Sequence, residues 1–281
     1  MIRYKEVTDK GIEIEQSSGR PLVYLDNWAL NIFSGDDSLG NNFINILNRL
    51  KGALLVSFVN LIEITNRKDD KQVSKIMKLI DSVDGGFIDV TPSSVIRKEE
   101  EIKIRKSFNF NNPCVDYELL KNYILYAHNP LKQFRISEAV LELKNGMGTE
   151  GIKEKYEENI FPVIKKARND AKILIKAKNR FKRNKMAIPI APCTKRLLSQ
   201  CIDYIAINEE MKMGNKEWRD VLHTIVPVVY CDFVLIDSRW TNFIKATGLK
   251  TPNIAKVYNQ REIEMFLKDL ECFEIKGHNT N

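Results

Sequence analysis

"PLVYLDNWALNIFSGDDSLGNNFINILNRLKGALLVSFVNLIEITNR", residues 21–67, contains the pattern from which the fold can be predicted. Two short, strongly apolar runs, at 21–26 and 53–57, are each followed by apolar residues at helical spacing. Gly52 ends the amphipathic helix expected at 41–52. This alternation of strand and helix with short loops predicts an α/β fold with a parallel sheet. Neither run alternates polar and apolar residues, as expected when helices cover both faces of a sheet.

The same alternation extends outward from this region. Toward the middle of the chain it predicts helices at 58–67 and 71–83 and a strand at 86–91. Near the C-terminus it predicts helices at 216–227 and 260–270 and strands at 233–236, 253–257 and 272–275. The first and last thirds of the chain are therefore expected to form one sheet.

The middle of the chain has a different character. Between residues 92 and 213 strand signals nearly vanish, and charged helical segments are expected at 93–106, 115–127, 134–145, 151–184 and 193–213. We interpret this region as a large helical insertion. The predicted organisation is a discontinuous α/β domain, residues 1–91 and 214–281, that is interrupted by the insertion, residues 92–213.

The composition is that of a globular chain with ample length for a core. Of its 281 residues, 43% are hydrophobic and 29% are charged. The five cysteines form no CxxC motif, so neither a disulfide framework nor a zinc cluster is indicated. The N-terminus lacks an apolar signal segment, and the longest apolar run, residues 224–231, is too short to span a bilayer. We expect a soluble, cytoplasmic protein with no membrane partner.

Basic residues are in excess, which favours a polyanionic partner such as nucleic acid. The net charge is +7, and residues 165–185 hold ten Lys or Arg and one Asp. The residues expected to contact a nucleic-acid backbone in this segment are Lys165, Arg168, Lys172, Lys176, Arg180 and Arg183. The alternative is that the segment is an ordinary solvated face.

Acidic residues stand where predicted strands end. In a parallel α/β sheet, ligands bind at the carboxyl ends of the strands. Asp26 ends the first strand, and Asp237 follows the strand "FVLI" at 233–236. Glu63 lies in the helix that leaves the second strand, and that helix starts above the same edge.

Distances along the chain place two more acids. The helix from Asp220 to Pro227 descends ~10 Å at about 1.5 Å per residue. The strand from Asp232 to Asp237 then rises ~17 Å at about 3.3 Å per residue. Asp220 is therefore expected beside Asp237, and Asp232 at the opposite edge, where it would bind backbone amides at the start of a strand.

Four carboxylates at one edge repel each other, and divalent cations relieve that repulsion. Mg²⁺ and Mn²⁺ prefer such oxygen ligands, and a site of this kind suits phosphodiester hydrolysis. Each acid also has an ordinary alternative as a helix cap or a half-exposed side chain. Ser57, Asn60 and His223 are auxiliary candidates that could orient a ligand, with core or capping roles as their alternative. There is no GxxxxGK[ST] loop, which excludes a P-loop NTPase.

These motifs resemble those of the PIN-domain nucleases. In that family an Asp ends strand one, a Glu lies in the helix after strand two, and two further Asp residues lie before strand four and at its end. The matching segments, which carry Asp26, Glu63, Asp220 and Asp237, are "VYLDNWAL", "VSFVNLIEITN" and "WRDVLHTIVPVVYCDFVLIDSRW". The form DxxH followed by YCD is similar to a subset of bacterial PIN-like proteins.

The resemblance covers about half of the chain and implies a three-layer α/β/α sandwich with a central parallel sheet. It also implies Mg²⁺ or Mn²⁺ as cofactor and cleavage of RNA or, less often, DNA. The four acids would be both the metal ligands and the catalytic residues. The large helical insertion departs from compact family members, which leaves a regulatory protein or a second copy of the chain open as partners. The rival hypothesis is a non-catalytic PIN-like module that binds nucleic acid or protein.

Overall fold

The computed structural model describes residues 2–8, 11–16, 19–104, 113–117, 119, 135–145, 161–187, 193–211 and 215–274. Most of the helix expected at 115–127 and the first part of the one expected at 151–184 lie outside these residues. No helix in the described ranges combines the length and the apolar character needed to cross a membrane.

A parallel sheet organises the fold. Within the described residues it has five strands in the order β5-β4-β3-β6-β7. Their bounds are β3 (Leu22–Leu25), β4 (Ala53–Val56), β5 (Gly85–Phe87), β6 (Phe233–Leu235) and β7 (Lys256–Tyr258). The central strand β3 pairs with β4 on one side and with β6 on the other, and Val23 is in register with both Leu54 and Phe233. This confirms that the first and last thirds of the chain build one sheet.

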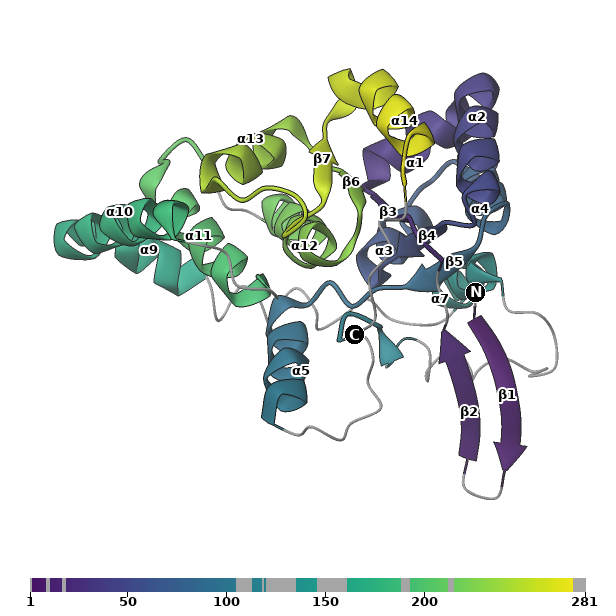
Figure 1. The fold of residues 1–281 in the computed structure, drawn as a ribbon, viewed down its shortest axis with the longest axis horizontal. Helices are drawn as coiled ribbons and strands as arrows, with labels where there is room; N and C mark the ends of the chain where they lie inside the picture. The colour runs from purple at the N-terminus through teal and green to yellow at the C-terminus, as the bar shows by residue number, and fades with distance from the viewer. Residues whose placement is uncertain are drawn as a thin grey trace.

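Helices cover the two faces of this sheet (Figure 1). From the first third come α1 (Asn27–Gly35), α2 (Asp37–Arg49), α3 (Phe58–Thr65) and α4 (Asp70–Asp81). The middle contributes α5 (Pro92–Ile104), α7 (Ile136–Asn145), α9 (Phe161–Asn169), α10 (Ala171–Met186) and α11 (Thr194–Ile207). The last third adds α12 (Asn215–Tyr230), α13 (Ser238–Thr247), the 3₁₀ turn η1 (Gln260–Glu262) and α14 (Ile263–Glu271).

The three central strands β4, β3 and β6 are buried throughout because each face of the sheet contributes to a hydrophobic core. Val23 and Leu25 of β3 join a cluster with α1, α2, α4 and α14. Leu22 and Tyr24 point the other way, into a cluster with α12 and α13, because successive side chains of a strand alternate between its faces. The result is the expected three-layer α/β/α arrangement.

The middle of the chain contributes to both cores, and Val140 of α7 packs in the cluster formed with α1, α2 and α4. Val95 of α5 and Leu197, Cys201 and Ile205 of α11 pack in the same cluster as α12. The helices α9 and α10 lie farther out, at the end of the molecule opposite the N-terminal hairpin (Figure 1). The described helices of the expected insertion are thus partly built into both faces of the α/β domain.

The single helix expected at 151–184 is instead divided at Asp170. The carboxylate of Asp170 accepts hydrogen bonds from the backbone N–H groups of Lys172 and Ile173, at 2.8 and 3.2 Å, and so begins α10 as a new helix. A capping side chain of this kind competes with continued helical hydrogen bonding. The basic segment is therefore distributed over two helices, α9 and α10.

Two further elements differ from the expectation. The N-terminal hairpin of β1 (Ile2–Thr8) and β2 (Gly11–Gln16) and the helix α13 had no predicted counterpart. No strand forms over 272–274; Phe273 packs its ring 5.6 Å from that of Phe233. Phe273 is partly buried against the core, which is consistent with the apolar residue that suggested a strand.

Replacing Phe266 with Ala is expected to lower the free energy of unfolding by about 3–5 kcal/mol, because a large buried ring is lost. Phe266 is fully buried against Phe33, Phe43 and Phe233. Its neighbour Met265 is 49% exposed, so Met265→Ala should change stability by less than about 0.5 kcal/mol. Urea denaturation of the two variants measures the difference, and equal losses would contradict this packing.

Candidate metal centre at the carboxyl edge of the sheet

The order of the strands creates a topological switch point. From β3 the chain continues to β4 on one side, whereas β6 occupies the other side. Such a point leaves a crevice at the carboxyl ends of the two central strands, where ligands of α/β proteins bind. Asp26 directly follows β3, and Asp237 lies two residues after β6, so the two acids flank the switch point.

Asp26 is held rigidly at this edge. Its backbone N–H donates to the carbonyl of Leu235 at 2.9 Å, and its Oδ1 accepts from the N–H of Asn27 at 2.6 Å as the N-cap of α1. The residue is 6% exposed. Burial raises the pKa of Asp26, and the charges of Glu63 and Asp237 add to that effect. An ionised Asp26 therefore needs a cation close by.

Glu63 approaches from α3. The capping box between Ser57 and Asn60 starts this helix at the end of β4 and sets its direction. The Oε2 atom lies 3.3 Å from His223 Nε2, and Oε1 lies 3.4 Å from Arg219 Nη1. Burial raises the pKa of Glu63, but the hydrogen bond and charge of His223, with Arg219, outweigh it and leave the pKa below its usual value.

His223 completes a three-residue group. It projects from α12, is 1% exposed, and places Nε2 3.3 Å from Glu63 Oε2 and 3.6 Å from Asp26 Oδ1. Burial lowers the pKa of the imidazole, but the two carboxylates more than reverse this and raise it. Ligand atoms of Asp26, Glu63 and His223 all lie within 4.8 Å of one another, so the group could hold a metal ion.

Asp220 and Asp237 lie at the same edge but outside this group. The Oδ2 of Asp220 accepts a hydrogen bond from Arg239 Nη2 at 2.8 Å. Burial, with the charges of Asp26 and Asp237, raises the pKa of Asp220 to about 6. Asp237 is exposed and makes no side-chain capping bond to α13. All four predicted acids are thus near one another. His223, which was expected only as an auxiliary residue, belongs to the same three-residue group as Asp26 and Glu63.

Asp232 lies at the opposite edge, as the chain distances predict. Its Oδ2 accepts from the N–H of Leu22 at 2.7 Å, and its Oδ1 pairs with Arg20 Nη2 at 3.1 Å. Leu22 is the first residue of β3, so Asp232 binds a backbone amide at the start of a strand. The expected structural role of this acid is confirmed.

Three residues of the site were not predicted, namely Tyr24, Arg219 and Arg239. Tyr24 lies two residues before Asp26, so both side chains leave β3 toward the same face. A buried hydroxyl in an otherwise apolar strand needs a partner, and that requirement was a usable signal. Arg219 lies one helical turn before His223, so its position beside His223 could have been predicted from helical spacing.

The basic segment is only partly free to bind a partner. Lys165, Lys172, Lys176 and Arg183 are exposed. The Nη2 of Arg168, by contrast, donates to the carbonyls of Ile205, Asn208 and Met211 at 2.7–3.0 Å. The guanidinium of Arg180 forms a two-point ion pair with the buried carboxylate of Asp203. Arg168 and Arg180 therefore hold α9 and α10 against α11 and its C-terminal end, which is a structural role that the sequence did not indicate.

The basic helix is also separated from the acidic edge. It meets α13 at Gly248, where a Cβ atom would lie 3.1 Å from Lys185 Cγ. The helix α13 starts beside Asp237 and spans ten residues, a length of ~15 Å, before it reaches Gly248. A substrate that contacts both the Lys185 end of α10 and Asp237 must extend along α13.

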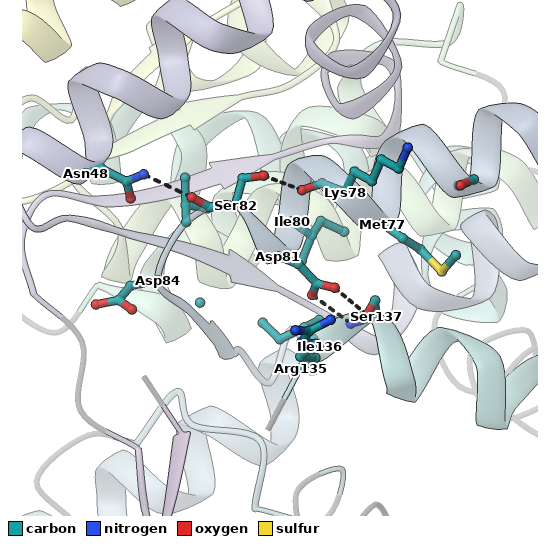
Figure 2. Close-up of a pocket in the computed structure, with 13 residues that line it drawn as sticks. Asn48, Met77, Lys78, Ile80, Asp81, Ser82, Asp84, Arg135, Ile136 and Ser137 are labelled. Carbon is teal, nitrogen blue, oxygen red and sulfur yellow. Dashed lines mark hydrogen bonds between the residues drawn. The ribbon is translucent and has the colours of Figure 1, made fainter. Parts of the chain in front are cut away.

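A cavity of about 730 Å³ lies away from the acids, at the amino edge where β5 begins (Figure 2). It is lined by the ends of α2 and α4 and the start of α7. Asn48 Nδ2 donates to the carbonyl of Ser82 at 2.9 Å, and the N–H of Ser137 donates to Asp81 Oδ1 at 3.2 Å (Figure 2). Its lining includes no residue of the candidate centre, so the cavity is separate from that centre.

No protein-family model, no curated protein and no solved structure matches this chain. The chemistry of the carboxyl edge is therefore the guide to function. Two carboxylates and one imidazole within 4.8 Å provide oxygen and nitrogen donors for a divalent cation, and the buried acids favour a positive charge between them.

Replacing Asp220 with Asn is expected to stabilise the metal-free protein above pH 6 by up to ~3 kcal/mol, because the pKa of this carboxyl is raised to about 6. Because the folded-state pKa lies above the unfolded value of about 3.9, the contribution of the group is fully present below about pH 4 and is lost as the pH rises through about 6. The stability of the variant should not fall over this pH range. Its gain in stability is reduced, because Arg239 loses its charged partner.

Urea denaturation over a series of pH values from about 4 to above 6 measures this effect. Asp232→Asn is the matched control, because Asn keeps an acceptor for the N–H of Leu22 at the other edge. If Asp220→Asn follows the same pH profile as the wild type, the ionised carboxylate carries no cost and the prediction is wrong.

Proposed function

We propose that the chain is a metal-dependent nuclease that hydrolyses phosphodiester bonds, with single-stranded RNA as its substrate. The observation that supports this most directly is the group of Asp26, Glu63 and His223, with ligand atoms within 4.8 Å of one another at the switch point of a parallel sheet. Asp220 and Asp237 lie beside it and keep the edge strongly acidic.

A divalent cation fits this set of donors. Asp26 is ionised only at a cost, because burial raises its pKa, and a bound cation would remove that cost. Asp26, Glu63 and His223 would hold the ion. When bound, it would lower the pKa of a water molecule and offset the charge of the scissile phosphate. Mg²⁺ and Mn²⁺ are the ions to which the resemblance points.

Other residues of the edge have roles toward the substrate. Arg219 and Arg239 each expose 38% of the side chain at the rim, and each pairs there with an acid. A guanidinium group binds a phosphate through two parallel hydrogen bonds, so these arginines can hold the phosphodiester beside the acids. Asp237, which is exposed and makes no side-chain capping bond to α13, is available to a water molecule or a second cation.

RNA as the substrate rests on two arguments. PIN-domain nucleases, which the motifs resemble, cleave RNA more often than DNA. The exposed cations of α9 and α10 provide a surface for a polyanion, which the acidic edge alone would repel. The Lys185 end of α10 meets the far end of α13, a helix ~15 Å long that starts beside Asp237. We therefore expect α10 to bind nucleotides away from the scissile bond.

The alternative is a non-catalytic module that binds nucleic acid or protein, and one observation favours it. Arg219 pairs with Glu63, Arg239 pairs with Asp220, and His223 lies against Asp26. These cations offset the acids without a metal ion. Titration with Mn²⁺ discriminates between the two functions, because the alternative predicts no specific binding that depends on Asp26.

Asp26→Asn and Asp237→Asn are each expected to lower Mn²⁺-dependent cleavage of a labelled single-stranded RNA by at least ~100-fold. The fold should survive, since each change relieves repulsion between acids in the metal-free protein. Asp232→Asn, at the opposite edge, should cleave like the wild type. Undiminished cleavage by the Asp26 variant would show that any activity belongs to other residues.

Reversing four charges on the basic helices is expected to weaken binding of single-stranded RNA and to flatten its dependence on salt. Each phosphate contact contributes a slope of about −0.7 to the logarithm of affinity against the logarithm of salt. The exposed residues to change to Glu are Lys165, Lys172, Lys176 and Arg183. Affinity for Mn²⁺ should change little, because the proposed ligands lie elsewhere.

A control variant carries the same change in net charge at a distant surface. Its four exposed lysines, to be changed to Glu, lie on α4 and α14 and are Lys71, Lys75, Lys78 and Lys268. Fluorescence anisotropy over a series of salt concentrations compares the two variants. Equal slopes would mean that net charge alone, and no localised basic surface, determines binding.

A further inference from the structure

A buried chain of hydrogen bonds connects the backbone of β3 to the imidazole of His223. It runs from the carbonyl of Leu25 through the side chains of Asn60, Ser57 and Tyr24 to His223 Nδ1. The four side chains are 0–1% exposed. Each proton in this chain must therefore be matched by an acceptor within it.

Backbone groups fix the orientation of Asn60. The carbonyl of Leu25 can only accept, so the atom 3.1 Å from it is the Asn60 amide nitrogen. The N–H of Ser57 can only donate, so the atom 3.0 Å from it is Asn60 Oδ1. A flipped amide would place two donors together at Ser57 and two acceptors together at Leu25.

The direction of the remaining bonds follows from this orientation. Ser57 Oγ lies 2.9 Å from Asn60 Oδ1, an atom without a proton, so the serine hydroxyl donates there. The oxygen of Ser57 is then the acceptor for the hydroxyl of Tyr24 at 2.9 Å. Tyr24 has a single proton, and its own oxygen consequently accepts from His223 Nδ1–H at 2.5 Å.

We infer that Tyr24 is a positioning residue that holds the neutral imidazole of His223 in the Nδ1–H tautomer, so that Nε2 offers its lone pair to a metal ion shared with Asp26 and Glu63. This rests on the metal site of the proposed function and makes it more specific. Histidines that bind metals are commonly oriented by a hydrogen bond to their other nitrogen. A nitrogen ligand favours Mn²⁺, or a later transition metal such as Zn²⁺, over Mg²⁺.

The opposite direction of the chain makes a different prediction. If Tyr24 donated to Nδ1, the proton of the neutral ring would lie on Nε2, 3.3 Å from Glu63 Oε2. The imidazole would then be a hydrogen-bond donor to the acids, and no lone pair would face the metal. The two directions differ in one observable, the position of the proton in the neutral ring.

Nitrogen-15 NMR of the metal-free protein, at a pH where the ring is neutral, reports this position directly. The chain has three histidines, so spectra of His128→Gln and His278→Gln identify the signals of His223. The expected result is a protonated Nδ1 and an unprotonated Nε2. The reverse tautomer would overturn the inference, whether or not the protein cleaves RNA.

The second test is Tyr24→Phe, which removes the hydroxyl and keeps the buried ring. Titrations with Mn²⁺ and Mg²⁺, without nucleic acid, are expected to show a loss of Mn²⁺ affinity of roughly 10–100-fold. Mg²⁺, which depends on the carboxylates, should lose less. A merely structural role for Tyr24 would lower stability and leave the ratio of the two affinities unchanged, which would count against the inference.

Tyr258→Phe is the control. Its hydroxyl donates to Asp269 Oδ2 at 2.5 Å, and its ring packs in the core of the other face of the sheet. It should leave both metal affinities unchanged. If metals bind with the expected ratio and no RNA is cleaved, the proposed function fails and the role of Tyr24 stands. If cleavage depends on Asp26 but Tyr24→Phe leaves the ratio of Mn²⁺ to Mg²⁺ affinity unchanged, only this inference fails.

Discussion

Parallel pairing between β3 and β6 holds together segments from the two ends of the chain. The bond from the N–H of Asp26 to the carbonyl of Leu235 continues this pairing to the carboxyl edge. Without the pairing of β3 with β6, the helix α12 and the strand β6 would have no fixed position relative to Asp26. The acids, His223 and the rim arginines come from four separate elements, so their geometry is a consequence of this register. The hydrophobic clusters on both faces stabilise the same arrangement.

The two buried carboxylates respond differently to the same surroundings. Asp26 and Glu63 face one imidazole, yet burial dominates at Asp26 and raises its pKa, while His223 and Arg219 prevail at Glu63 and lower it. Adjacent acids whose environments separate their pKa values are characteristic of functional sites. The separation arises because Asp26 is the more deeply buried of the two, whereas Glu63 has both the hydrogen bond of His223 and Arg219 at 3.4 Å.

The position of the acids could be predicted from the sequence, whereas the contacts that their partners make could be predicted only in part. Asp26, Glu63, Asp220 and Asp237 were placed at one edge because strand direction and rise per residue determine which ends of an element meet. The contacts of Tyr24 and Arg239 depend on side-chain conformations in segments that are distant in sequence, and no periodicity reports these. The division of the basic region at Asp170 was missed because a cap overrides helix propensity through one side chain. Arg168 and Arg180 looked like free cations because charge in a sequence does not show which groups a neighbouring helix leaves unpaired.

The side chain of Gln16 bears on whether the edge of the sheet can pair with another chain. Its amide donates to the carbonyl of Phe87 at 3.1 Å and accepts from the N–H of Phe87 at 2.9 Å, as a residue of a neighbouring strand would do. β5 is the outermost strand on its side of the sheet within the described residues. Exposed strand edges recruit other chains and so promote aggregation. One glutamine therefore occupies both backbone groups of Phe87, which are then not available for pairing with a strand of another chain.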